Sequence, residues 1–354
     1  MSGEARRELL RPRALFLSVF ATGAAVVWLA GVRIRLGPSA LVLVKNSMNI
    51  THQGQCSDSW GVFRRNHSTL TETQWIHRST NASPPPFNIS TIDNSFASLI
   101  VHENFAFCAI EKNACTQWNS VLRNMFHNKT DRGFNTPDYH LGKQSQQRYG
   151  PNKIKQLFES PNSTLVVMIR DPLARFASAY LEKCFAWKCS NGFCFARPAS
   201  QKGQPISFRT ALNWILSDHV NVSQIDGHWA LQSTRCGIAN GGLEHYYSIV
   251  GKMTKTSLQH DGACIMEMAG IERFNINEKG ESFWKTGGLH YQEHHQQLGD
   301  EETLLKKLYT QEAARQFMHK FRQDYDTFQL PEPPWVQEAT GEWIDSLDHH
   351  SCAE

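Results

Sequence analysis

The sequence predicts an α/β protein in which a mainly parallel, P-loop-like sheet is flanked by helices. Apolar, strand-like runs alternate with segments of helical periodicity, a pattern typical of parallel sheets covered by helices on both faces. Before the first of these runs come a charge-free stretch and then a long polar stretch. We therefore expect an N-terminal transmembrane helix and a stalk in front of the sheet domain.

The charge-free stretch runs from Ala14 to Val32. At about 1.5 Å per residue, a helix of this length just spans a hydrocarbon core of ~30 Å. Four arginines precede it and two follow it, which favours a cytosolic N-terminus. A cleaved signal peptide is the alternative, but its apolar core is usually only about 7–15 residues long. The expected organisation is a cytosolic tail 1–13, a signal anchor 14–32, a stalk 33–97, a folded domain 98–335 and a C-terminal tail 336–354.

Glycosylation sequons and cysteines indicate a lumenal location for the rest of the chain. Sequons occur at Asn49, Asn66, Asn81, Asn88, Asn128, Asn162 and Asn221, and such a density predicts a glycosylated stalk. In a lumenal domain, several of the nine cysteines are expected to form disulfides. A zinc site at Cys184, Cys189 and Cys194 is the alternative, although no C-x2-C pair or adjacent histidine supports it.

The charge balance does not point to nucleic acid. The formal net charge is +3 and no run of Lys and Arg occurs. An ordinary solvated surface explains this composition, so no nucleic-acid partner is expected.

The folded domain is predicted to alternate strands and helices. Strands are expected over 99–110, 164–169 and 246–250, and helices over 116–127, 173–185, from Ser207 onward and over 301–328. Asp171 and Pro172 suit the cap and the first position of the second helix.

Two short segments follow strands and open helices. The first is Ile110-Glu-Lys-Asn-Ala-Cys-Thr-Gln-Trp118, and the second is Ile169-Arg-Asp-Pro-Leu-Ala-Arg-Phe-Ala-Ser-Ala-Tyr180. Backbone N–H groups at a helix start, together with a cation and a hydroxyl, form an anion site. Two such sites suit a ligand with two separate phosphates.

These segments resemble the Golgi membrane-bound carbohydrate sulfotransferases. Lys112-x-x-x-Thr116 is similar to the loop that binds the 5′-phosphosulfate of 3′-phosphoadenosine 5′-phosphosulfate (PAPS), and the Arg170 segment resembles the one that binds its 3′-phosphate. The resemblance continues in order through His228-Trp229, Cys236, Tyr247-Ser-Ile-Val-Gly-Lys252, Tyr309 and Asp324-Tyr-Asp-Thr-Phe328. One departure is Glu111, where many relatives have proline.

The resemblance implies sulfuryl transfer from PAPS to a hydroxyl of a glycan, by a single-pass type II protein of the Golgi membrane with a lumenal catalytic domain. Lys112 would neutralise charge on the leaving 5′-phosphate, while the residues from Asn113 through Ala114 and Cys115 to Thr116 cradle that phosphate. Arg170 and Ser178 would bind the 3′-phosphate. No metal is expected, and the sequence does not predict the oligomeric state.

The catalytic base has two histidine candidates. His228 comes first because the His-Trp pair occurs in the family and a neutral imidazole suits proton abstraction. His140 lies between the two phosphate segments and comes second. The carboxylates of Glu103, Asp226 and Glu244 are further alternatives.

Several other residues allow two interpretations. Arg175 could contact the ligand or pair with Asp171, and Trp118 could stack on adenine or pack in the core. The segments 285–288 and 290–295 suit turns or loops better than a phosphate or metal site.

Two other functions compete with sulfuryl transfer. A P-loop kinase is disfavoured because G-x-x-x-x-G-K-[ST] is missing from the sequence. A glycan-binding protein that has the fold but no catalysis remains the alternative.

Overall fold

The structure, a computed structural model, describes residues 99–126, 141–160, 162–186, 194, 206–239, 241–253, 258–275 and 300–345, with four short strands before them. The chain divides into two compact units, Met1–Asp58 and Ser59–Glu354. The candidate site lies in the second unit.

In the first unit, the described backbone forms an antiparallel three-stranded sheet of β1 (Leu17–Val19), β2 (Ala25–Leu29) and β3 (Val32–Leu36). No helix within the described residues is both long enough and apolar enough to cross a bilayer. The transmembrane helix expected over 14–32 is therefore not shown, and the anchor stays a prediction.

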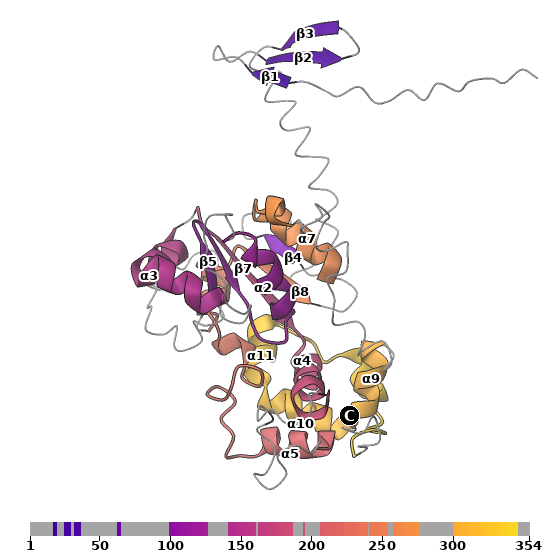
Figure 1. Cartoon of the computed structure of the whole chain (residues 1–354). Coiled ribbons are helices and arrows are strands. Elements are labelled where there is room, and N and C mark those ends of the chain that lie inside the picture. The colour runs from indigo at the N-terminus through magenta and orange to yellow at the C-terminus, as the bar shows by residue number, and fades with distance from the viewer. Residues whose placement is uncertain are drawn as a thin grey trace, which may run out of the picture. The chain divides into compact units, whose positions relative to one another are not determined.

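A five-stranded sheet forms the centre of the second unit, in the order β4-β8-β7-β6-β5 (Figure 1). Its strands are β4 (Val62–Arg64), β5 (Leu99–His102), β6 (Phe105–Cys108), β7 (Thr164–Arg170) and β8 (Ile249–Met253). The three inner strands are parallel, and both edge strands run antiparallel to their neighbours. The parallel strands therefore bring the ends of β6, β7 and β8 to the same edge of the sheet.

The sheet is buried on both faces because its strands are apolar at successive positions. On β7, Leu165, Val167 and Ile169 belong to one hydrophobic cluster, and Val166 and Met168 to another. The first cluster includes residues of α3 and α4, and the second includes residues of α2 and α7. Helices on both faces of a partly parallel sheet agree with the predicted α/β class.

The helices of the second unit follow in chain order. They are α2 (Cys115–Arg123), α3 (Leu141–Glu159), α4 (Pro172–Tyr180), α5 (Phe208–Leu216), α6 (Gly242–Tyr246), α7 (Leu258–Met268), α9 (Glu301–Leu308), α10 (Gln311–Lys320) and α11 (Arg322–Phe328). Short turns are η4 (Leu181–Ala186, π-helical), η6 (Gln232–Thr234), η7 (Glu272–Phe274) and η9 (Pro334–Glu338). Gly150, with φ 70° and Pro151 after it, kinks α3 into two parts.

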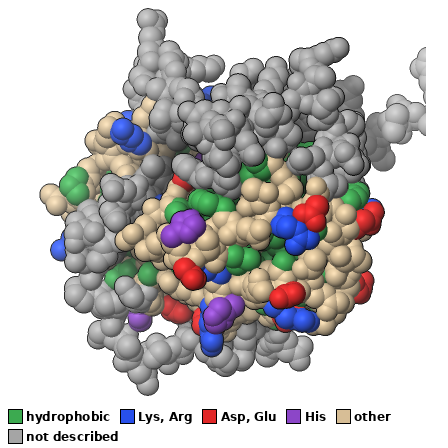
Figure 2. All heavy atoms as spheres, turned by 90° about the horizontal axis from the view of Figure 1, so that it is seen from below, with side chains coloured by type: hydrophobic (Ala, Val, Ile, Leu, Met, Phe, Trp, Pro, Cys, Tyr) green, Lys and Arg blue, Asp and Glu red, His purple; other side chains and the backbone are tan. Residues whose placement is uncertain are grey.

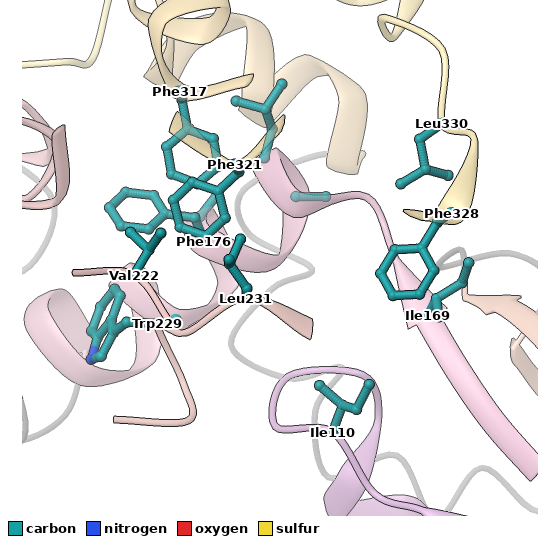
Figure 3. Close-up of a cluster of buried hydrophobic side chains, with 14 of the residues drawn as sticks. Ile110, Ile169, Phe176, Val222, Trp229, Leu231, Phe317, Phe321, Phe328 and Leu330 are labelled. Carbon is teal, nitrogen blue, oxygen red and sulfur yellow. The ribbon is translucent and has the colours of Figure 1, made fainter. Parts of the chain in front are cut away.

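Helices α4, α5, α10 and α11 lie together below the strands in Figure 1. Aromatic and aliphatic side chains fill the space among them, and Figure 3 shows Phe176 beside Phe317 and Phe321, with Phe328 beside Ile169. Ile169 precedes Arg170, the last residue of β7. The end of this strand is therefore fixed by the C-terminal helices.

The predicted strand over 99–110 is wrong as a single element. It is a hairpin, because the polar pair Glu103 and Asn104 interrupts the apolar run and Glu103 adopts φ 49°. His102 pairs with Phe105, so the turn contains only two residues, which favours left-handed backbone.

Two further boundaries differ from the expectation. Tyr246 ends α6 rather than starting a strand, and β8 begins at Ile249. The single helix expected over 301–328 is three helices, because the Thr310 side chain caps a new one by accepting from the Ala313 amide at 3.1 Å. By contrast, Ser207 caps α5 as predicted.

Disulfides join Cys108 to Cys236 and Cys184 to Cys194. These pairs confirm the expectation of disulfides, and they remove two of the three cysteines of the alternative zinc site. On the face shown in Figure 2, acidic and basic side chains of the described residues are interspersed.

Candidate functional site

The first junction, residues 109–114 between β6 and α2, has a tight backbone. Lys112 and Ala114 adopt φ 69° and 58°, conformations that residues with a Cβ rarely take. Turns in which left-handed residues alternate with ordinary ones can direct successive backbone amides toward an anion. Ala114 is the N-cap of α2 and provides no side-chain cap, so amides at the helix start can receive a ligand.

The Asn113 side chain is buried and points into the protein interior rather than toward solvent. Its Nδ2 donates to the Met168 carbonyl at 2.8 Å and to Gln232 Oε1 at 2.6 Å, and its backbone amide donates to the Ile110 carbonyl at 3.1 Å. Asn113 therefore anchors the first junction to β7. The amides from Ala114 to Thr116 are better placed than its own to bind an anion.

The second junction, Arg170 and Asp171 between β7 and α4, is built differently. Asp171 accepts from the Ala174 amide at 3.0 Å and caps α4, with Pro172 in the first turn, as predicted. Burial raises the pKa of Asp171 despite this hydrogen bond. Because its own side chain occupies the helix start, this junction offers an anion mainly the Arg170 guanidinium.

The two junctions touch each other. Arg170 Nη1 donates to the Lys112 carbonyl at 3.1 Å, and its Nη2 forms an ion pair with Glu301 at the start of α9. The fold thus places the Arg170 side chain against the backbone of Lys112, while the two cationic groups pair with different carboxylates, Glu301 and Glu182.

Gln232 holds the two junctions in register. Its side chain accepts from the Arg170 amide at 3.1 Å and donates to the Arg170 carbonyl at 2.8 Å, while it also accepts from Asn113. Asp324 accepts from the Gln232 amide at 2.9 Å and from the Ser233 amide at 2.8 Å. Burial raises the pKa of Asp324 even with these donors. Sequence reasoning missed Gln232, whose only signal was its place after His-Trp.

Arg175 neither pairs with the Asp171 carboxylate nor points out of the protein. It is 2% exposed and donates to three backbone carbonyls, those of Glu111 at 2.8 Å, Ala230 at 2.6 Å and Gly227. Burial lowers its pKa to about 10. Its guanidinium therefore ties the first junction to the turn that carries His228, which differs from both sequence interpretations.

His228 lies at the surface of that turn. Its Nδ1 is 2.6 Å from Asp226 Oδ1, which also accepts from the His228 amide at 3.0 Å. Burial would raise the pKa of Asp226, but the bonds from His228 outweigh it and lower the pKa. A carboxylate on one ring nitrogen orients the imidazole and leaves the other nitrogen for a substrate. Asp226, an alternative base in the sequence, therefore acts on the geometry of His228.

Lys112 is not a solvated surface lysine. It is 8% exposed, and its ammonium pairs with Glu182 on the π-helical turn after α4. Burial would raise the pKa of Glu182, but the ammonium groups of Lys112 and Lys183 lower it to about 2. Glu182 was not among the predicted site residues, and no pattern in the neighbouring sequence indicates this contact.

The family model described as the sulfotransferase family matches residues 100–331. The match covers more than half of the 354 residues and includes both junctions and the His228 turn. The chain belongs to the sulfotransferase family. Neither the comparison with curated proteins nor the comparison with solved structures finds a match.

The remaining predicted residues of this sulfotransferase differ in exposure. Thr116 is exposed in the first turn of α2, whereas Ser178 is 4% exposed inside α4. Cys115 is a free thiol whose pKa is raised by desolvation, which suits a small loop residue better than a nucleophile. Trp118 is fully buried and stacks on Phe107 at 4.4 Å, so the core interpretation is correct.

Glu111, the departure from proline, pairs with Arg235 at 3.5 Å. The substitution thus adds an ionic contact between the first junction and the segment after His228. His140 and the segments 285–288 and 290–295 lie outside the described residues, so their roles stay predictions. Within the described part of the chain, no group of three His, Cys, Asp or Glu side chains could hold a metal ion.

Proposed function

We propose that the protein transfers a sulfuryl group from PAPS to a hydroxyl of a glycan. The observation that carries this proposal is the contact of the Arg170 guanidinium with the Lys112 carbonyl, which joins the two junctions at one edge of the sheet, beside the uncapped start of α2. Family membership supplies the reaction class. Donor and acceptor follow from the resemblance of the two junctions to the PAPS-binding segments.

In this mechanism, the Lys112 ammonium neutralises charge on the leaving 5′-phosphate, and the α2 amides and the Thr116 hydroxyl donate to that phosphate. Arg170 and Ser178 bind the 3′-phosphate. His228, oriented by Asp226, takes the proton of the acceptor hydroxyl as the oxygen attacks sulfur and the S–O bond to the 5′-phosphate breaks. No metal is assigned a role.

The decisive experiment is turnover of labelled PAPS with a panel of sulfate-free glycans, using full-length protein from a eukaryotic host. Transfer of label to one glycan class, lost in Lys112→Ala, supports the proposal. Glycan binding without any transfer or PAPS binding would favour the second candidate, a glycan-binding protein of the same fold.

We further propose that the protein is a single-pass type II Golgi membrane protein with its sulfotransferase domain in the lumen. The disulfides Cys108–Cys236 and Cys184–Cys194 support an oxidising compartment, and Asn162 and Asn221 are sequons within the domain. Glycosidase treatment should lower the apparent mass, and intact microsomes should protect the domain from protease. An unchanged mass with full protease sensitivity would contradict this topology.

A further inference from the structure

Two buried lysines share one carboxylate beside the first junction. The Lys112 ammonium pairs with Glu182 Oε2, and the Lys183 Nζ atom lies 2.7 Å from Glu182 Oε1. Both lysine side chains are less than one tenth exposed, whereas the Glu182 side chain is 37% exposed. The carboxylate therefore lies between two ammonium groups and is open to solvent on another side.

The local backbone explains this arrangement. Helix α4 ends at Tyr180 and continues as the π-helical turn 181–186, whose second and third residues are Glu182 and Lys183. The wider π-helical backbone changes the direction of side chains relative to a regular helix and is frequent at functional sites. The disulfide between Cys184 and Cys194 begins at the next residue and restrains the turn. Glu182 is thereby held against Lys112, which lies in the first junction after β6, and Lys183 is held against Glu182.

A carboxylate between two ammonium groups presents two anionic oxygens to two cations. A phosphosulfate presents the same pattern of oxygens, and lysine binds phosphate through its point charge. We infer that Lys183 is a second cation of the 5′-phosphosulfate subsite, and that Glu182 is an internal carboxylate which the donor's anionic oxygens replace. This inference deepens the proposed function and rests on it.

The second junction provides a matched comparison. The Arg170 guanidinium pairs with Glu301, whose side chain is 25% exposed. Glu301 opens α9, where Asp300 already caps the helix by accepting from the Thr303 amide at 2.9 Å. Each predicted phosphate cation therefore carries one carboxylate from a different element, Glu182 for the 5′ end and Glu301 for the 3′ end.

The test measures binding of two half-ligands, adenosine 5′-phosphosulfate and adenosine 3′-phosphate, by calorimetry on the folded, disulfide-bonded protein. Lys183→Met should weaken the 5′ ligand about tenfold, as loss of a charged hydrogen bond does, and leave the 3′ ligand unchanged. Glu182→Gln should tighten only the 5′ ligand, because a competing charge is gone. Glu301→Gln should tighten only the 3′ ligand.

Lys155→Met, at an exposed lysine on α3, is the matched control and should change neither affinity. Equal weakening of both ligands in Lys183→Met, or an unchanged 5′ affinity, would overturn the inference, and so would weaker 5′ binding in Glu182→Gln. If the parent protein binds neither half-ligand nor PAPS, the proposed function fails and this inference fails with it. If the parent protein binds PAPS, but the Lys183, Glu182 and Glu301 variants do not each change the affinity of only their own half-ligand, this inference alone fails.

Discussion

The two junctions both connect an inner strand of the sheet to a helix, but they offer an anion different groups. At the first junction, Ala114 leaves the start of α2 without a side-chain cap, so backbone amides and Lys112 can act together. At the second junction, Asp171 caps α4, so Arg170 must act through its side chain. The presence of a capping carboxylate therefore decides whether a helix start can bind a phosphate by its backbone.

Arg175 ties the first junction to the His228 turn, so the proposed proton transfer belongs beside this junction. We expect His228→Ala to lower kcat by about 10²–10⁴-fold, the range for loss of a general base, with little change in PAPS affinity. Steady-state kinetics with a PAPS binding assay measure both quantities.

His140→Ala is the comparison variant for this prediction. If it loses kcat while His228→Ala does not, the two roles exchange. If neither folded variant loses even tenfold, a carboxylate or a group on the substrate acts as the base.

The two cations should respond differently, with smaller effects. Lys112→Ala and Arg170→Ala should each lower kcat/KM by about 10²–10³-fold, the loss typical of a charged donor at a preorganised site. The Lys112 loss should lie mainly in kcat, because charge develops on the 5′-phosphate, and the Arg170 loss mainly in KM for PAPS. If the loss divides between kcat and KM in the same way in both variants, the two junctions do not differ in function.

The Ser178 hydroxyl tests the proposal that the second junction binds the 3′-phosphate through side chains rather than helix-start amides. Ser178→Ala should weaken PAPS by roughly 1–2 kcal/mol, as loss of a buried hydrogen bond does. Because the side chain is buried, the melting temperature must be measured in parallel. Adenosine 5′-phosphosulfate is the control ligand, and equal weakening of its binding would show a structural effect instead.

The cap itself can be removed. Asp171→Ala should lower the free energy of unfolding by about 1 kcal/mol, whereas Asp171→Asn should preserve most of it because asparagine also caps helices. Denaturant unfolding of the two variants measures this difference. Equal destabilisation would mean that the charge near Lys252 or the bond from Tyr325, rather than the cap, is what matters.

Glu182, the carboxylate beside the first junction, should give the smallest effect, a pH-dependent contribution to stability. The pKa of Glu182 is lowered to about 2 from the ordinary 4.5, so its stabilisation is present above pH 4.5 and lost as the pH falls toward 2. Because the group is partly exposed, we expect less than about 1 kcal/mol. The melting temperature of Glu182→Gln should approach that of the parent between pH 7 and pH 3, and a constant difference would contradict this origin.

Features that depend on a few adjacent residues were predictable from the sequence. They are the α/β class, β7, the Asp171 cap, Pro172 at the start of α4 and the Ser207 cap. The hairpin of β5 and β6 was missed, since burial on both faces hides the alternation that marks strand boundaries. Long-range polar contacts left no local pattern. Gln232 and Glu182 lie far in sequence from the junctions they contact, so only the fold reveals them.

The Cys108–Cys236 disulfide closes a loop with a sequence separation of 128 residues. Both junctions, the π-helical turn and His228 lie between these cysteines, so they all belong to one covalent ring. Closing a ring of this size restricts the unfolded chain by on the order of 5 kcal/mol. It also means that a single protease cut between the two cysteines leaves every proposed donor-binding residue on one molecule until the sulfur bridge is reduced.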